Sequence, residues 1–210
     1  MSNIETTLLI GGLIGFVSAV LSPIVSEPIR NWIHGPKLEL FFSPKSRDCK
    51  SLTREVVTIR NTNVVGGVTN AETEAYYIRA RVENKGHQIA KQCKVFLINV
   101  EKYNPATRKY EDTIFCDSIQ LTWSASGNDN DKFRALDLPR GVKQYIDLIS
   151  TRKISQAYRL EVQTQLFRYQ ELFLEQGEFL LTILVSGDNV QPVYKKILFV
   201  WNGRWNDFRL

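Results

Sequence analysis

The sequence contains little of the material from which metal and catalytic sites are built. Its 210 residues include three Cys and two His, with no Cys-x-x-Cys spacing and no glycine-rich phosphate loop outside the first hydrophobic stretch. Cys49, Cys93 and Cys116 are odd in number, and neither His34 nor His87 has a second histidine or a nucleophile beside it. We therefore predict no metal site, no cofactor, no disulfide framework and no enzymatic activity. Cys93 and Cys116 are expected to be small core residues.

Charged residues are absent from Thr6 to Ser26, a stretch of 21 positions. As a helix rising about 1.5 Å per residue, this stretch measures ~31 Å, close to the ~30 Å hydrocarbon core of a bilayer. No basic residue precedes it and no Ala-x-Ala follows it, which favours a transmembrane anchor over a cleaved signal peptide. Residues 1–33 are thus predicted to be an anchor with an interfacial segment, and residues 34–210 a folded domain.

Basic residues lie only on the C-terminal side of this stretch. Arg30, Lys37 and Lys45 follow it within about 20 residues, and no Lys or Arg precedes it. Because basic flanks stay on the cytoplasmic side, the sequence predicts a single-pass protein of the cell membrane. Its N-terminus would face out and its C-terminal domain would lie in the cytoplasm.

One face of the predicted membrane helix carries small side chains. Gly11, Gly15 and Ala19 follow each other at intervals of four, so they lie along one stripe of a helix. Such a stripe lets two backbones approach closely, and close packing is the main drive for helix association in lipid. The stripe predicts self-association, although glycine is also common in membrane helices that do not associate.

Beyond residue 35 the sequence has no long pattern with a helical period, and apolar and polar residues alternate instead. Tyr76, Ile78, Ala80 and Val82 alternate with polar residues, as in a strand that buries one face. About eight or nine such short segments, separated by turn residues, predict an all-β domain, an immunoglobulin-like antiparallel β-sandwich. The polar residues 45–74 are expected to form a long loop with one edge strand near residues 56–60.

A resemblance to a known family supports this fold. The pattern Tyr77-x-Arg79-x-Arg81-Val82-x-Asn84-x-Gly86-x-x-x-Ala90-x-x-Cys93 resembles the N-x-G-x-x-x-A hairpin of bacterial immunoglobulin-like modules, namely the CARDB-like cell-adhesion-related domains. Leu138-Pro139-Arg140-Gly141 and the strand after Gly177 are similar to later parts of that family. The resemblance covers residues 74–200 and implies an immunoglobulin-like sandwich without indicating a ligand. Independently of it, Asn84 and Gly86 are expected to supply positive φ angles in a hairpin.

The charge and the aromatic residues suggest where a partner could bind. The net charge is +5, and without residues 1–33 the chain has 26 basic and 20 acidic side chains, a net +6. This excess suits an anionic membrane surface or a plain solvated face, and it is too mild to favour nucleic acid. The possible partner or ligand surface comprises Arg79, Arg81, Trp201, Arg204 and Trp205. Trp201 and Trp205 could instead cover the end of the sandwich.

Three functions remain open at this stage. The first is a membrane-anchored, non-catalytic binding module that acts as a sensor, adaptor or scaffold at the cytoplasmic face, with an unidentified protein or small molecule as its ligand. The second is a ligand-sensing membrane effector of a bacterial immune-type system that oligomerises through its helix. The third, an extracytoplasmic adhesion module, requires the opposite orientation.

Overall fold

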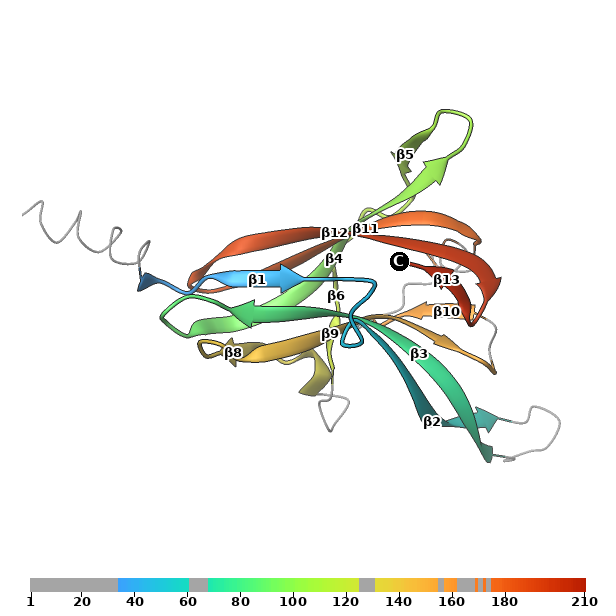
Figure 1. Cartoon of the computed structure of the whole chain (residues 1–210), viewed down its shortest axis with the longest axis horizontal. Coiled ribbons are helices and arrows are strands. Elements are labelled where there is room, and N and C mark those ends of the chain that lie inside the picture. Colours follow the sequence, from blue (N-terminus) through green and yellow to red (C-terminus); the bar gives the residue numbers. More distant parts are fainter. Residues whose placement is uncertain are drawn as a thin grey trace, which may run out of the picture.

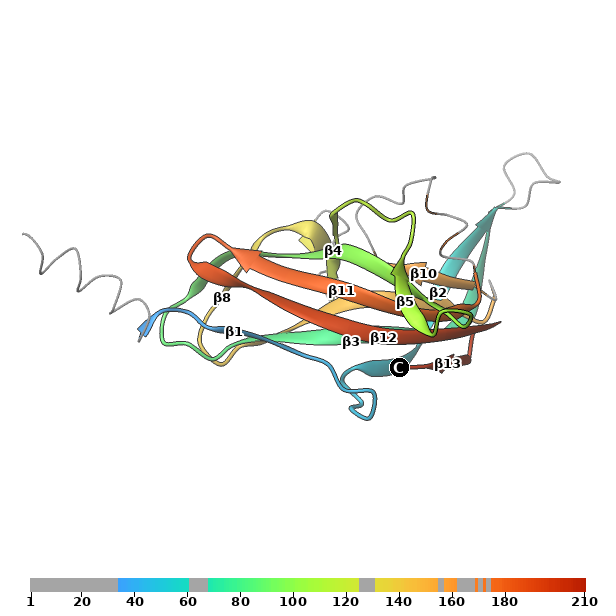
Figure 2. The same cartoon turned by 90° about the horizontal axis from the view of Figure 1, so that it is seen from above.

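The computed structural model describes residues 34–60, 68–124, 131–154, 157–161, 169, 172 and 175–210. Within these residues nearly all regular structure is β-strand, arranged in two antiparallel sheets that pack against each other (Figures 1 and 2). This architecture is consistent with the predicted β-sandwich. The predicted anchor, including Gly11, Gly15 and Ala19, lies outside the described residues.

The first sheet, called the β3 sheet, has six strands in the order β1-β3-β9-β10, with β2 also paired to β3 and β7 to β9. Its strands are β1 (Leu38–Phe41), β2 (Lys50–Arg60), β3 (Val68–Asn84), β7 (Thr122–Trp123), β9 (Lys143–Arg152) and β10 (Ala157–Leu160).

The second sheet, called the β11 sheet, has seven strands in the order β13-β12-β11-β4-β5, with β6 and β8 also paired to β4. Its strands are β4 (Ala90–Asn104), β5 (Lys109–Asp112), β6 (Ile119–Gln120), β8 (Leu136–Leu138), β11 (Gly177–Gly187), β12 (Val190–Arg204) and β13 (Asp207–Arg209). A 3-10 turn, η1 (Asp131–Phe133), precedes β8.

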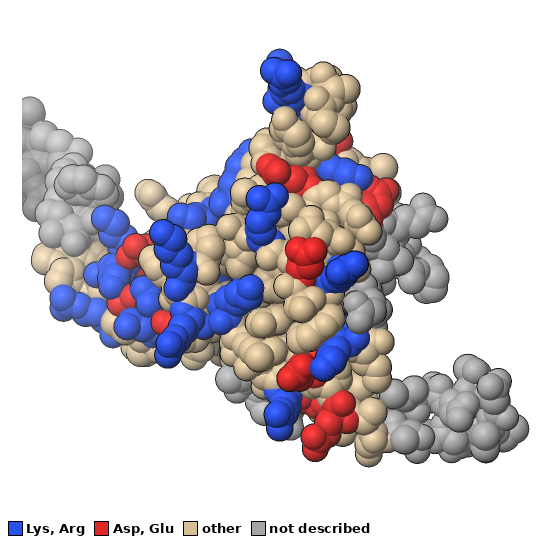
Figure 3. Space-filling view, turned by 45° about the vertical axis from the view of Figure 1, so that its right-hand side comes forward, with Lys and Arg blue, Asp and Glu red and all other residues tan. Residues whose placement is uncertain are grey.

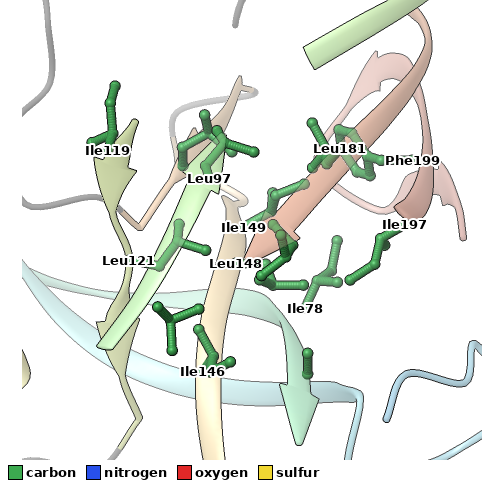
Figure 4. Packing of buried hydrophobic residues seen from close by; sticks show 14 of the residues in the cluster. Ile78, Leu97, Ile119, Leu121, Ile146, Leu148, Ile149, Leu181, Ile197 and Phe199 are labelled. Atoms are coloured by element: carbon green, nitrogen blue, oxygen red, sulfur yellow. The ribbon is translucent and has the colours of Figure 1, made fainter. Parts of the chain in front are cut away.

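The core lies between the two sheets and is built from their inward-facing aliphatic and aromatic side chains (Figure 4). Ile78 and Ile149 from the β3 sheet meet Leu97, Leu181 and Phe199 from the β11 sheet, and each is at most 3% exposed. Burial of this apolar surface supplies the main stabilisation of the fold, at about 25 cal/mol per Å².

The alternation predicted around Tyr76 is confirmed in β3. Ile78, Ala80 and Val82 are fully buried, whereas Arg79 and Arg81 on the opposite face are partly exposed. Successive side chains of a strand point to opposite faces, so the polar residues necessarily occupy the outer side of the sheet.

The prediction of a long loop over residues 45–74 is wrong, whereas the edge strand expected near residues 56–60 is present as part of β2. Strand β2 pairs with β3 over its whole length, from Lys50 opposite Ile78 to Arg60 opposite Val68. The hairpin forms an arm that projects from the sandwich (Figure 1). Its ladder is made by backbone groups, and Leu52 and Val56 of β2 are 55% and 64% exposed. A strand whose apolar side chains stay exposed need not alternate apolar and polar residues in the sequence.

Candidate functional site

Four segments meet at the end of the sandwich where the described chain begins (Figure 1). They are residues 34–38 at the start of the domain, 84–91 between β3 and β4, 137–143 between β8 and β9, and 187–193 between β11 and β12. We call them together the loop end. They lie far apart in the sequence, and side-chain amides of two asparagines hold them together.

Asn84 is the first of these asparagines and is fully buried. Its Oδ1 accepts hydrogen bonds from the backbone N–H of Lys37 at 3.1 Å and of Gly86 at 2.9 Å. Its Nδ2 donates to the carbonyl oxygens of Gln88 at 2.7 Å and Leu138 at 2.9 Å. Because one amide satisfies two donors and two acceptors, it ties three of the four segments together.

Gly86 is required for close approach and not for a positive φ angle, contrary to the expectation. Neither Asn84 nor Gly86 is among the described residues with positive φ. A Cβ at position 86 would lie 2.2 Å from the carbonyl oxygen of Gly35 and 2.4 Å from the nitrogen of Lys37. Only glycine therefore lets the β3–β4 turn pack against the start of the domain.

Asn189 is the second asparagine and holds the β11–β12 turn against β4. Its Oδ1 accepts from the backbone N–H of Lys91 at 2.8 Å, and its Nδ2 donates to the carbonyl of Ile89 at 2.9 Å. The backbone N–H of Asp188 also donates to Lys91 O at 3.0 Å. Both edges of the loop end are thus fixed by hydrogen bonds.

A recess of about 1000 Å³ opens at the loop end. It is lined by the start of the domain, the β3–β4 turn and the β11–β12 turn, and its charged lining residues include Lys37, Lys85 and Asp188. His87 also lines it, and its ring centroid lies 5.7 Å from that of His34, so the expectation that neither histidine has a second one beside it is wrong. The lining side-chain amides are those of Gln88, Asn189 and Gln191.

Basic side chains outnumber acidic ones at the loop end. Figure 3 shows Lys and Arg gathered toward the side of the molecule from which the described chain starts. The exposed basic residues of the four segments are Lys37, Lys85, Lys91, Arg140 and Lys143, and the acidic ones are Asp137 and Asp188. Asp137 is engaged by the protein itself, since it accepts from the backbone N–H of Gln92 at 2.8 Å. The loop end is therefore net positive.

Two apolar side chains accompany these charges. Ile89 in the β3–β4 turn is 48% exposed, and Val142 in the β8–β9 turn is 37% exposed. Both apolar side chains therefore lie in turns that also carry exposed basic residues.

The cysteines are poorly suited to chemistry at this site. Cys93 lies beneath the loop end, where burial first, and then the charges of Asp137 and Asp188, raise the pKa of its thiol to about 11. A thiol that stays protonated at neutral pH is a weak nucleophile. Cys49 is buried as well, but Cys116 is exposed, so the expectation that Cys116 belongs to the core is wrong.

The five residues of the predicted partner surface do not form one patch. Arg79 lies on the outer face of the β3 sheet, where its Nε donates to Asp147 at 2.6 Å. Arg81 lies on the same face over the ring of Phe41, with 4.5 Å between its guanidinium carbon and the ring centroid. Both guanidinium groups are partly buried and held by neighbours, so neither is a free point of attachment.

Trp201 belongs to the core, and its inclusion in a surface is wrong. Its side chain is 2% exposed, and its ring contacts that of Tyr158 edge-on at 5.4 Å. Trp205 is partly exposed and stacks on Tyr76 at 5.4 Å, on the face of β3 opposite to Arg79. Of Trp201, Arg204 and Trp205, only Arg204 is exposed.

A polar cluster on the outer face of the β3 sheet was not foreseen from the sequence. Tyr77 donates from its hydroxyl to Glu55 at 2.7 Å, and Arg152 pairs with the same carboxylate. Burial and then this hydrogen bond raise the pKa of Tyr77 far above its usual value. Burial favours the neutral form of Arg152, but the hydrogen bond and the charge of Glu55 outweigh this effect, so the pKa of Arg152 is raised. The cluster joins residues up to 97 positions apart, so no local pattern could have indicated it.

Within the described residues no group of three or more His, Cys, Asp or Glu could hold a metal ion. No helix among those same residues is both long and apolar enough to cross a membrane. Comparison of the chain with protein-family models, with curated proteins and with solved structures finds no match. Inference about function therefore depends on the chain's own residues.

Proposed function

We propose that this chain is a single-pass membrane protein whose immunoglobulin-like sandwich lies at the cytoplasmic face and acts by binding, as a sensor, adaptor or scaffold. The observation that carries the proposal is the uncharged stretch Thr6–Ser26, which is followed within about ten residues by an ordered domain. The resemblance of residues 74–200 to CARDB-like modules supports the immunoglobulin-like sandwich alone, because such sandwiches host many different functions.

The side chains of the described domain support binding over catalysis. The polar cluster on the outer face of the β3 sheet pairs its groups with one another, since Glu55 binds both Tyr77 and Arg152. Its tyrosine has a raised pKa and stays protonated, so it is a poor base. The loop end, in contrast, offers exposed charges and a recess that a partner can reach.

The orientation can be tested with a reporter fused after Leu210. Because Arg30, Lys37 and Lys45 all follow the uncharged stretch, a reporter that works only in the cytoplasm should be active and one that works only outside should be silent. Replacing the three residues by Glu should lower the cytoplasmic signal, whereas replacing Lys109, Lys153 and Lys195 should not. Activity of the external reporter on the unaltered chain would favour the adhesion module instead.

The effector hypothesis depends on the stripe Gly11, Gly15 and Ala19 and is tested separately. Replacing Gly11 and Gly15 by Leu should separate two packed helices by a few Å, yet the segment stays hydrophobic enough to insert. We expect the double substitution to reduce self-association in a membrane two-hybrid assay while membrane abundance is unchanged. Leu9→Ala with Val20→Ala is the control and should have less effect. Unaltered association of the double variant would remove support for oligomerisation through the helix.

A further inference from the structure

We propose that the loop end rests on the headgroup layer of the bilayer that anchors the chain, where its basic side chains contact the phosphates of anionic lipids and its apolar tips enter the interface. The proposal rests on the proposed function, because it requires the anchor in residues 1–33. It adds a partner, anionic phospholipid, and a surface of the domain that faces it.

The first argument is the short distance available to the chain. Trp32 is expected at headgroup depth, and Gly35 follows only three residues later, so at most ~11 Å of extended chain separate them. From Gly35 onward the chain is held to the β3–β4 turn, since His87 N donates to Gly35 O at 3.3 Å and Lys85 N to Lys37 O at 2.8 Å. The loop end therefore cannot move far from the membrane.

The second argument is charge. A separation of ~11 Å or less is between one and two Debye lengths, each ~8 Å at physiological salt, so the loop end still feels the charge of the lipid phosphates. The exposed Lys37, Lys91 and Lys143 make no ion pair within 4.0 Å among the described residues, whereas Lys85 is shared with Glu83 at 2.5 Å. An anionic leaflet supplies these three lysines with counter-charges in addition to the protein's own carboxylates.

The third argument is the position of the exposed apolar residues. Ile89 and Val142 belong to two different turns of the loop end, and both turns are hydrogen-bonded to the buried Asn84. Exposed in water they gain nothing, but inserted between headgroups they bury apolar surface beside the lysines that bind the phosphates. The recess between the turns, lined by Lys37 and Lys85, is large enough to admit a headgroup.

The test uses the full chain reconstituted in two kinds of lipid nanodisc. One contains only zwitterionic phosphatidylcholine, and the other also contains anionic phosphatidylglycerol. Amine-reactive labelling read by mass spectrometry then reports each lysine. We expect Lys37, Lys91 and Lys143 to react about fivefold more slowly in the anionic discs, corresponding to the ~1 kcal/mol per lysine found near anionic leaflets. High salt should restore the rates. Lys109, exposed in β5 away from the loop end, is the internal control.

A matched pair of variants separates the apolar tips from the remaining surface. Ile89→Asp with Val142→Asp should abolish the protection of the three lysines. Ile114→Asp with Ile154→Asp, at positions 64% and 47% exposed elsewhere, should leave it unchanged. Both pairs replace exposed side chains, so the fold is retained and the circular dichroism spectra should match.

The outcomes distinguish this proposal from the proposed function. If the chain enters the discs but its lysines react equally in both lipids, the headgroup contact is refuted and the anchor stands. If the chain does not enter discs at all, both are refuted. If glycerol phosphate added to phosphatidylcholine discs protects the same lysines, the recess binds a small soluble phosphate compound and the lipid contact is refuted.

Discussion

Asn84→Ala should lower the free energy of unfolding by about 4 kcal/mol. The substitution leaves two backbone donors and two carbonyl acceptors without their partner, and each buried group left unpaired costs about 1–3 kcal/mol. Water can reach part of the site, which keeps the total below the sum. For a domain of this size the melting temperature should fall by roughly 8–16 °C. Urea denaturation of the full-length chain, followed by circular dichroism, measures the effect.

Two further variants make this prediction specific. Asn84→Asp keeps the acceptor for Lys37 and Gly86 but cannot donate to Gln88 and Leu138, so it should destabilise at least as strongly as Ala. Asn202→Ala loses one exposed hydrogen bond, to Asp207 at 2.8 Å, and should change the free energy of unfolding by less than about 1 kcal/mol. Equal effects of Asn84→Ala and Asn202→Ala would contradict the central role of Asn84.

Trp201→Ala should lower the free energy of unfolding by about 3–5 kcal/mol, the range for removing a buried large aromatic residue. Its ring contacts those of Tyr158, at 5.4 Å, and Phe199, at 6.3 Å, and these two rings also contact each other at 5.1 Å. Truncation therefore leaves a cavity in an aromatic part of the core. A partner-docking tryptophan would behave differently, because its loss weakens binding and leaves stability nearly unchanged.

Trp205→Ala is the matched control for this substitution. Trp205 is partly exposed and makes one stacked contact, with Tyr76 at 5.4 Å. Its truncation should cost about 1 kcal/mol, close to the value of a single aromatic pair. Thermal unfolding of the two variants measures both losses of stability. If Trp201→Ala loses less stability than Trp205→Ala, the assignment of Trp201 to the core is contradicted.

Strand faces could be predicted along β3 because a single physical rule governs them. A strand with one buried face must alternate apolar and polar residues, and Ile78, Ala80 and Val82 do so without interruption. The turn at Asn84 and Gly86 was also predictable, since these residue types favour turns. The physical reason for these two residues in the turn could not be predicted. The hydrogen bonds of the Asn84 amide to Lys37 and Leu138, and the close approach of Gly86 to Gly35, join residues about 50 positions apart.

The sequence alone settled the all-β class, through alternation and turn chemistry that act over a few residues. Only the tertiary structure decided which residues meet. The arm formed by β2, the Glu55 cluster and the loop end all depend on pairings between distant segments, as between Lys91 and Asn189, 98 positions apart. Trp201 and Trp205 look alike in the sequence, yet the pairing of β12 with β11 and β13 buries the first and leaves the second at the rim. Whether a side chain is buried depends on which other segment packs against it, and the local sequence does not specify that segment.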